Sequence, residues 1–123
     1  MNHDEFVKKY YDIAKRALEF SEKARREGLL ALEEKFDHEK INDRDIFEYG
    51  IRFVIDGTDQ EFIDKLLSNI LNQEKDEYMK VLKTIQKEAV LRIQDGMNPR
   101  QLYALLNSYT DIPLREDEMK PVW

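Results

Sequence analysis

Apolar residues recur every three or four positions along the first third of the chain. Between Phe6 and Ala24 the steps alternate between four and three residues, which is the spacing of a helix with one buried side. The same side continues beyond Gly28, through Leu32, to about Phe36. The pattern therefore predicts one unusually long first helix, and we expect Gly28 to mark a close helix crossing rather than a point where a partner reaches the backbone.

Two shorter patterns predict helices at residues 46–55 and from Asn98 onward. The polar stretch 37–45 predicts the loop before the first of them, and Gly57 supplies the left-handed residue that commonly follows a helix end. Asn98 followed by Pro99 is typical of a helix start. The apolar side of this final helix consists of Leu102, Leu105, Leu106 and Tyr109.

The third helix is predicted to be long as well. Thr58 and Glu61 have the spacing of a capping box, in which each side chain bonds a free backbone N–H of the first turn, so we expect the helix to start there. The polar stretch 72–77 interrupts the apolar side but contains neither Gly nor Pro, so we expect the helix to continue to about Asp95. Leu66 of this helix is expected in the core.

Together these elements predict an all-α fold, a single bundle of about four helices in which two long helices pack antiparallel. We expect the folded domain to span residues 1–111 and residues 112–123 to form a flexible tail, because the tail contains two prolines and an acidic run. The seam from Phe6 to Ala24 can pair within the chain or with a second copy, so a homodimer stays open.

Composition limits the class of protein. A chain of 123 residues can form one hydrophobic core, and 41% hydrophobic with 37% charged residues is typical of a helical protein. The absence of Cys excludes disulfide and thiolate chemistry. No apolar run approaches the roughly 18 residues that span a bilayer, and the first residues do not form a signal peptide. We therefore expect a soluble, cytoplasmic protein.

Charge and motifs argue against several functions. A net charge of -6 disfavours nucleic acid as the main partner, because phosphate binding needs a clustered positive field. The sequence has no metalloprotease motif, phosphate-binding loop or nucleophile elbow, and we expect His3 and His38 to be surface residues. The acidic groups at 33–34, 37 and 43–45 lack the spacing of a calcium loop. We expect no enzyme, no cofactor and no metal site, and a small metal-dependent enzyme is the least favoured alternative.

The stretch Lys23–Glu34 (KARREGLLALEE) combines paired charges with an unbroken apolar run. On one continuous helix, Arg25 and Glu33 would lie near the same face, about 80° apart. The charges could form a solvated lattice of internal ion pairs, such as Glu22 with Arg26. They could equally form a docking face, since an Arg and a Glu together recognise a partner that presents both signs.

Three blocks of the sequence resemble the flagellar stator protein MotA in the cytoplasmic regions of that family. The first is Lys23–Glu34, and the second is Tyr49–Thr58 (YGIRFVIDGT) with Glu61 and Ile63. The third is Lys87–Leu102 (KEAVLRIQDGMNPRQL) with Leu105–Tyr109 (LLNSY). The blocks occur in the family's order. The resemblance implies that the first two membrane helices of the family are absent before Met1 and the other two between the second and third blocks.

The resemblance also implies a partner and a binding face. The charged residues that the family uses to contact the rotor protein FliG fall on Arg25 and Glu33, and the predicted partner-binding residues are Arg25, Arg26, Glu33 and Glu34. We expect a non-enzymatic, stator-like protein that binds motor components, either the rotor or other stator subunits, and that cannot conduct ions itself. The alternative is a helical scaffold or adaptor in an assembly unrelated to motility.

Overall fold

The computed structural model describes residues 1–36, 45–115 and 119. Its helices are α1 (His3–Glu27), the 3-10 helix η1 (Leu29–Lys35), α2 (Ile46–Ile55), α3 (Gln60–Leu71), α4 (Glu77–Asp95) and α5 (Pro99–Asn107). Every regular element in these ranges is helical, so the predicted all-α class is confirmed. The predicted loop 37–45 lies, except for Asp45, outside the described residues, as does His38.

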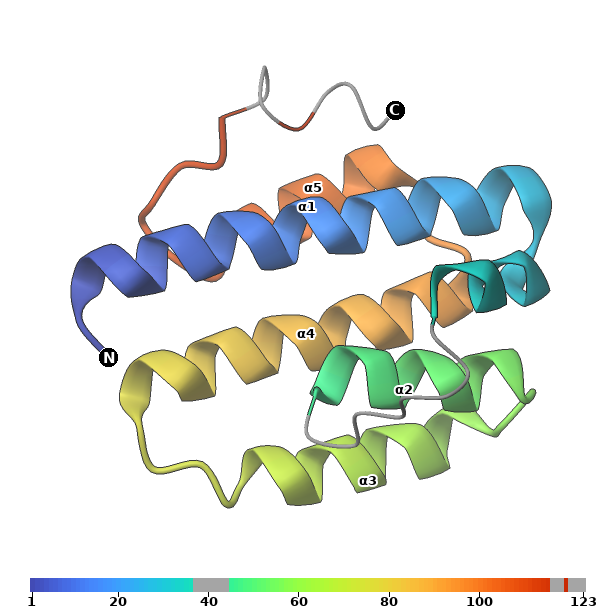
Figure 1. Cartoon of the computed structure of the whole chain (residues 1–123), viewed down its shortest axis with the longest axis horizontal. Coiled ribbons are helices and arrows are strands. Elements are labelled where there is room, and N and C mark those ends of the chain that lie inside the picture. The colour runs from blue at the N-terminus through green and yellow to red at the C-terminus, as the bar shows by residue number, and fades with distance from the viewer. Residues whose placement is uncertain (37–44, 116–118, 120–123) are drawn as a thin grey trace.

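Helices α1 and α4 lie side by side in the middle of the bundle, with α5 beside α1 and with α2 and α3 on the other side of α4 (Figure 1). The two central helices run in the same direction. At their starts the amino group of Met1 lies 3.0 Å from Asp76 Oδ2, and at their ends Arg25 Nη1 donates a 3.2 Å hydrogen bond to the carbonyl oxygen of Gly96. The predicted antiparallel pairing of two long helices is therefore wrong.

The prediction of one long first helix is also wrong, because the chain turns at Gly28. This glycine has φ 91° and ψ 160°, a region that essentially only glycine occupies, and α1 ends at Glu27. A Cβ atom at Gly28 would meet nothing within 4 Å, so the residue does not mark a close helix crossing. The close crossing is at Gly50 of α2, where a Cβ would lie 2.9 Å from Leu67 Cδ1 and from both γ carbons of Val90.

The predicted helix over 59–95 is two helices separated by a polar turn. The Glu74 carboxylate accepts hydrogen bonds from the backbone N–H groups of Lys75 (3.0 Å) and Asp76 (3.1 Å). Asp76 Oδ1 then accepts from the N–H of Met79 at 2.9 Å and caps α4. These side chains stop one helix and start the next without Gly or Pro, because they supply the backbone with partners outside the helical ladder. The described chain therefore contains five α-helices and one 3-10 helix rather than four helices.

Other helix ends agree with the sequence patterns except at the start of α3. Gly57 and Gly96 have positive φ angles of 76° and 79°, and the Asn98 side chain caps α5 by accepting from Gln101 N at 2.8 Å. The prediction of a capping box at Thr58 is wrong. The N–H of Thr58 donates to the carbonyl oxygen of Phe53 and closes the end of α2, so α3 begins one residue later, after Asp59.

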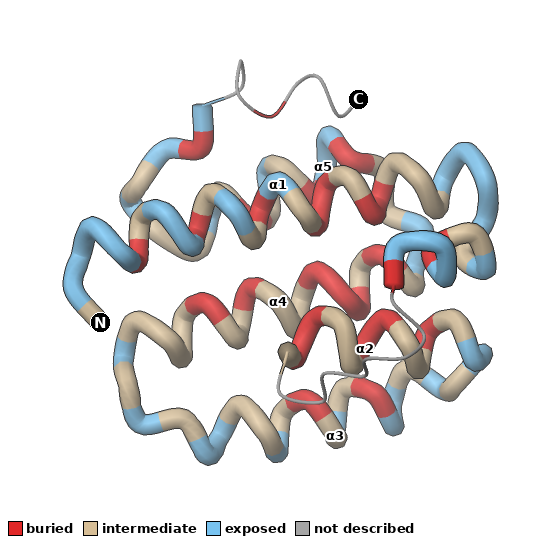
Figure 2. The backbone as a smooth tube through the Cα atoms, viewed as in Figure 1, coloured by how far each residue is buried: buried red, intermediate tan, exposed pale blue. Residues whose placement is uncertain are grey.

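Buried residues recur along the helices, with intermediate and exposed residues between them (Figure 2). Leu32 is fully buried, whereas Leu66 is only half-buried and lies outside the core, so its prediction as a core residue is wrong. The buried residues of α3 are Ile63 and Leu67, which set the inward side of that helix one residue away from Leu66.

The first residues after α5 return to the body of the bundle. Leu114 is buried, its N–H donates to Asn107 Oδ1 at 2.8 Å, and its carbonyl oxygen accepts from the Tyr103 hydroxyl at 2.6 Å. Residues 116–118 and 120–123 lie outside the described part, and the flexible tail over 112–123 stays a prediction.

Candidate functional site

The four predicted partner-binding residues lie at one end of the bundle, on two elements rather than one. Arg25 and Arg26 belong to the last turn of α1, and Glu33 and Glu34 belong to η1. The single helical face that the sequence suggested for them does not exist, because Gly28 separates the elements. The chain folds back at Gly28 and brings η1 against α1.

Apolar contacts hold η1 in place. Leu32 is fully buried, and the Phe36 ring that follows η1 lies 5.6 Å from the Phe20 ring of α1. The Arg52 guanidinium of α2 lies over the Phe36 ring at 4.9 Å. Cation–π contacts of this kind and a buried Leu both resist separation of the elements, so η1 is a fixed platform for its exposed side chains.

A lysine joins α1 to η1 through two carboxylates. Lys23 Nζ lies 3.0 Å from Glu27 Oε2 and 3.1 Å from Glu34 Oε2. The hydrogen bonds that Lys23 donates to Glu27 and then to Glu34 raise the pKa of Lys23 above its ordinary 10.5. The ammonium therefore keeps its charge at physiological pH and continues to hold Glu34 beside α1.

The predicted partner-binding side chains differ in how many contacts they already make within the bundle. Arg26 Nε pairs with Glu22 Oε1 at 3.2 Å, which confirms the predicted internal ion pair, although the Arg26 side chain remains 69% exposed. Arg25 uses one N–H group on the Gly96 carbonyl and is exposed. Glu33 is exposed, and within the described residues its carboxylate makes no ion pair. Arg25 and Glu33 are thus the two charges most available to a partner.

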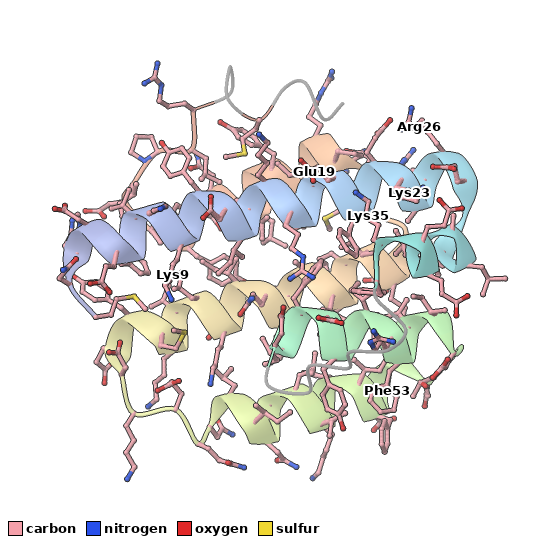
Figure 3. The ribbon with its side chains drawn as sticks, viewed as in Figure 1. Lys9, Glu19, Lys23, Arg26, Lys35 and Phe53 are labelled. Carbon is pink, nitrogen blue, oxygen red and sulfur yellow. The ribbon has the colours of Figure 1, made fainter. Side chains whose placement is uncertain are left out.

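A hollow of about 420 Å³ lies beside these residues, between α1 and η1. Figure 3 shows Glu19, Lys23 and Arg26 along α1 and Lys35 beside them. The side chains that line it carry both signs: Lys15, Glu19, Glu22, Lys23, Arg26, Glu27 and Lys35. In the described part of the chain, no three His, Asp or Glu side chains are grouped so that they could hold a metal ion. A surface of mixed charge suits recognition of another protein surface.

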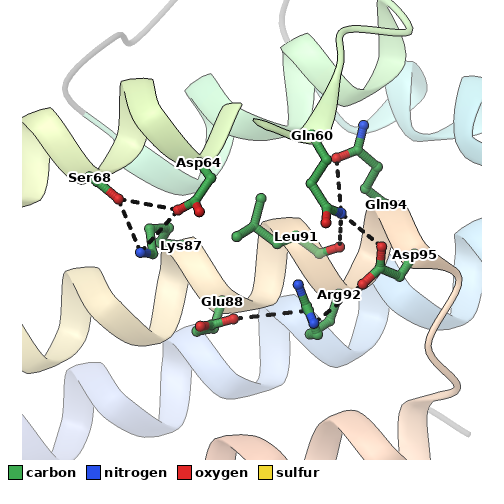
Figure 4. A network of polar contacts seen from close by, with 9 residues as sticks. All are labelled: Gln60, Asp64, Ser68, Lys87, Glu88, Leu91, Arg92, Gln94 and Asp95. Carbon is green, nitrogen blue, oxygen red and sulfur yellow. Dashed lines mark hydrogen bonds and ion pairs between the residues drawn. The ribbon is translucent and has the colours of Figure 1, made fainter. Parts of the chain in front are cut away.

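The polar side chains between α3 and α4 bond the two helices to each other rather than facing a partner. Lys87 Nζ lies 3.1 Å from both Asp64 Oδ1 and Ser68 Oγ, and Gln60 Nε2 donates to Leu91 O and Asp95 Oδ1 (Figure 4). These contacts clamp α3 antiparallel to α4, so this network is structural.

The sequence reading missed Leu30. This residue of η1 is 71% exposed, although it stands within the apolar run 29–32, and no role was predicted for it from the sequence. Gly28 could have indicated this exposure. A short helix that starts anew after a glycine need not bury the same positions that a continuation of α1 would bury.

Within the described ranges, no helix is both long enough and apolar enough to cross a membrane. No family model matches the chain, and no solved structure matches it.

Two relatives are named Motility protein A, and the chain resembles both over part of their length. It is 48% identical over 61 residues to Motility protein A of Borreliella burgdorferi, an alignment that covers 50% of this chain and 22% of the relative. It is 35% identical over 86 residues to Motility protein A of Treponema phagedenis, covering 70% of this chain and 32% of the relative. The chain thus spans between about a fifth and a third of these proteins.

Proposed function

We propose that the chain, given its resemblance to Motility protein A, is a stator-like protein of a flagellar motor that acts by binding another motor component. The binding face is the end of the bundle that carries Arg25, Arg26, Glu33 and Glu34, and the partner is the rotor protein FliG. The protein is not an enzyme and does not conduct ions itself. The observation that carries the proposal is the gathering of exposed charges of both signs at this end of a chain whose sequence resembles part of a motility protein.

The direction of the helices supports this choice of end. In the MotA family, membrane helices stand before the segment that resembles α1 and between the segments that resemble α3 and α4. In this bundle the start of α1 and the α3–α4 turn lie at the same end (Figure 1). The candidate face lies at the other end of α1, whose 25 residues extend about 37 Å at 1.5 Å per residue. The face therefore points away from the positions where the family enters the membrane.

Charge reversal tests the proposal. We expect Arg25→Glu or Glu33→Arg to weaken binding to FliG by about tenfold, because a like-charge repulsion replaces an attraction at a solvated interface. Both residues are exposed, so the midpoint of thermal unfolding should move by less than about 3 °C. Calorimetric titration and a thermal melt of each variant give the two quantities. Lys8→Glu is the matched control, because Lys8 is exposed on α1 near the opposite end.

Salt dependence and a compensating variant of the partner provide two further tests of this binding face. Binding should weaken as salt is added, since exposed charges are screened beyond roughly 8 Å at physiological ionic strength. A reversed charge on FliG should restore part of the affinity that the matching variant loses. Unchanged FliG binding in both variants would reject this face. No binding by the unaltered protein would instead favour the adaptor alternative outside motility.

A further inference from the structure

We infer that Leu30 is the apolar anchor of this binding face and inserts into an apolar pocket on the partner. In the described part of the chain two large hydrophobic side chains are exposed, Leu30 at 71% and Phe62 at 54%. The Phe62 ring has an aromatic neighbour, because the Phe53 ring lies 5.9 Å away. Leu30 is the more exposed of the two, and it lies on the element that carries Glu33.

The geometry of η1 explains why Leu30 faces the solvent. A 3-10 helix has three residues per turn, so side chains three positions apart lie on the same side. Leu29 and Leu32 therefore share the side that packs on the bundle, and Leu30 and Glu33 share the outer side. The backbone of Gly28 sets this orientation, because its conformation ends α1 and restarts the chain as η1.

Charged side chains of both signs flank Leu30 along the chain. Arg25 and Arg26 precede it across the Gly28 turn, and Glu33 and Glu34 follow it on η1. Binding energy in interfaces concentrates on a few side chains that become desolvated at the centre, while charges at the rim remain hydrated and steer the encounter. The matching surface on the partner is an apolar pocket bordered by acidic and basic side chains.

Leu30 and the charges should contribute to binding in different ways. Burial of an apolar side chain is only weakly affected by moderate salt, whereas the attraction between rim charges is screened. Loss of Leu30 should mainly speed dissociation, and loss of a rim charge should mainly slow association. This inference rests on the proposed function, because it concerns the same face and the same partner.

The experiment compares Leu30→Ser with Phe62→Ser in binding to FliG, measured by surface plasmon resonance at low and at high salt. We expect Leu30→Ser to raise Kd about 10- to 100-fold at both salt concentrations, the range given by full burial of one Leu side chain. The matched control Phe62→Ser also removes an exposed apolar side chain, and it should leave Kd within about twofold. Thermal melts of both variants should match that of the unaltered protein.

The outcomes separate this inference from the proposed function. If the unaltered protein binds FliG and Arg25→Glu weakens binding while Leu30→Ser does not, the proposed function stands and the role of Leu30 is rejected. An equal loss in Phe62→Ser would also reject it, because the effect would not be specific to η1. If light scattering shows a dimer that Leu30→Ser dissociates, Leu30 binds a second copy instead. If the unaltered protein does not bind FliG, both proposals fail together.

Discussion

Single residues decide where this chain turns, and Gly28 and Gly50 show which of their roles a local sequence pattern cannot predict. The apolar spacing continues past Gly28 and wrongly predicted an unbroken helix there, because spacing alone cannot distinguish a turn from a close packing contact. That distinction depends on the backbone angles at Gly28 and on what neighbours Gly50 across the bundle, where a Cβ would lie 2.9 Å from Leu67 and Val90. Both depend on tertiary contacts that no local pattern contains.

Substitution of Gly28 tests this account of the turn. Gly28→Ala should lower the free energy of unfolding by about 1 to 3 kcal/mol, because alanine is strained at φ 91° and ψ 160° even though its Cβ would have open space. Urea denaturation measures the change. Gly96→Asn is the matched control, since Gly96 has φ 79° and ψ 24°, the left-handed conformation that asparagine tolerates. An unchanged stability with increased helical circular dichroism would mean that α1 continues through residue 28.

At the scale of elements, the sequence identified the helical segments well but misplaced three boundaries: the end of α1, the start of α3 and the turn between α3 and α4. The apolar sides of α1, α2 and α5 and the caps at Gly57 and Asn98 follow from local patterns. The α3–α4 turn was missed because it is built by carboxylates rather than by Gly or Pro. The signal was the acidic pair at 76–77 just before the apolar spacing resumes, which is typical of a helix start.

The same turn should make the fold sensitive to acid. Hydrogen bonding by Lys83 lowers the pKa of Glu74 below its ordinary 4.5, and the backbone N–H of Met79, followed by the amino group of Met1, lowers the pKa of Asp76 below its ordinary 3.8. A carboxylate with a lowered folded pKa stabilises the fold above its ordinary pKa, and this stabilisation is lost as the pH falls through the folded value. Stability should therefore decline from about pH 4.5 downward.

Thermal melts between pH 7 and pH 3 measure this dependence. The double variant Glu74→Gln with Asp76→Asn should flatten the curve below about pH 4.5 relative to the unaltered protein, because neither side chain can then take up a proton. Glu61→Gln, at an exposed carboxylate on α3, is the control and should leave the shape of the curve unchanged. Parallel curves for the unaltered protein and the double variant would show that the turn does not contribute to acid sensitivity.

At the scale of the whole molecule, one missed turn reverses the packing. A continuous helix over 59–95 would have run antiparallel to α1, whereas a turn after Leu71 sends α4 back in the direction of α1. The sequence thus predicted the class of fold and its apolar sides but not the direction of the central pair. For the candidate site, the resemblance supplied the charged residues, and the structure supplied their arrangement on two elements and the exposed Leu30.

The proposed binding face is the end of the bundle formed by the last turn of α1 and by η1. Titration of the isotopically labelled protein with unlabelled FliG, followed through backbone amide chemical shifts in NMR spectra, tests it over the whole molecule at once. The largest shift changes are expected within residues 25–34, and residues 72–79, at the opposite end, should change little. Changes concentrated at residues 72–79, or on α3, would contradict this binding face.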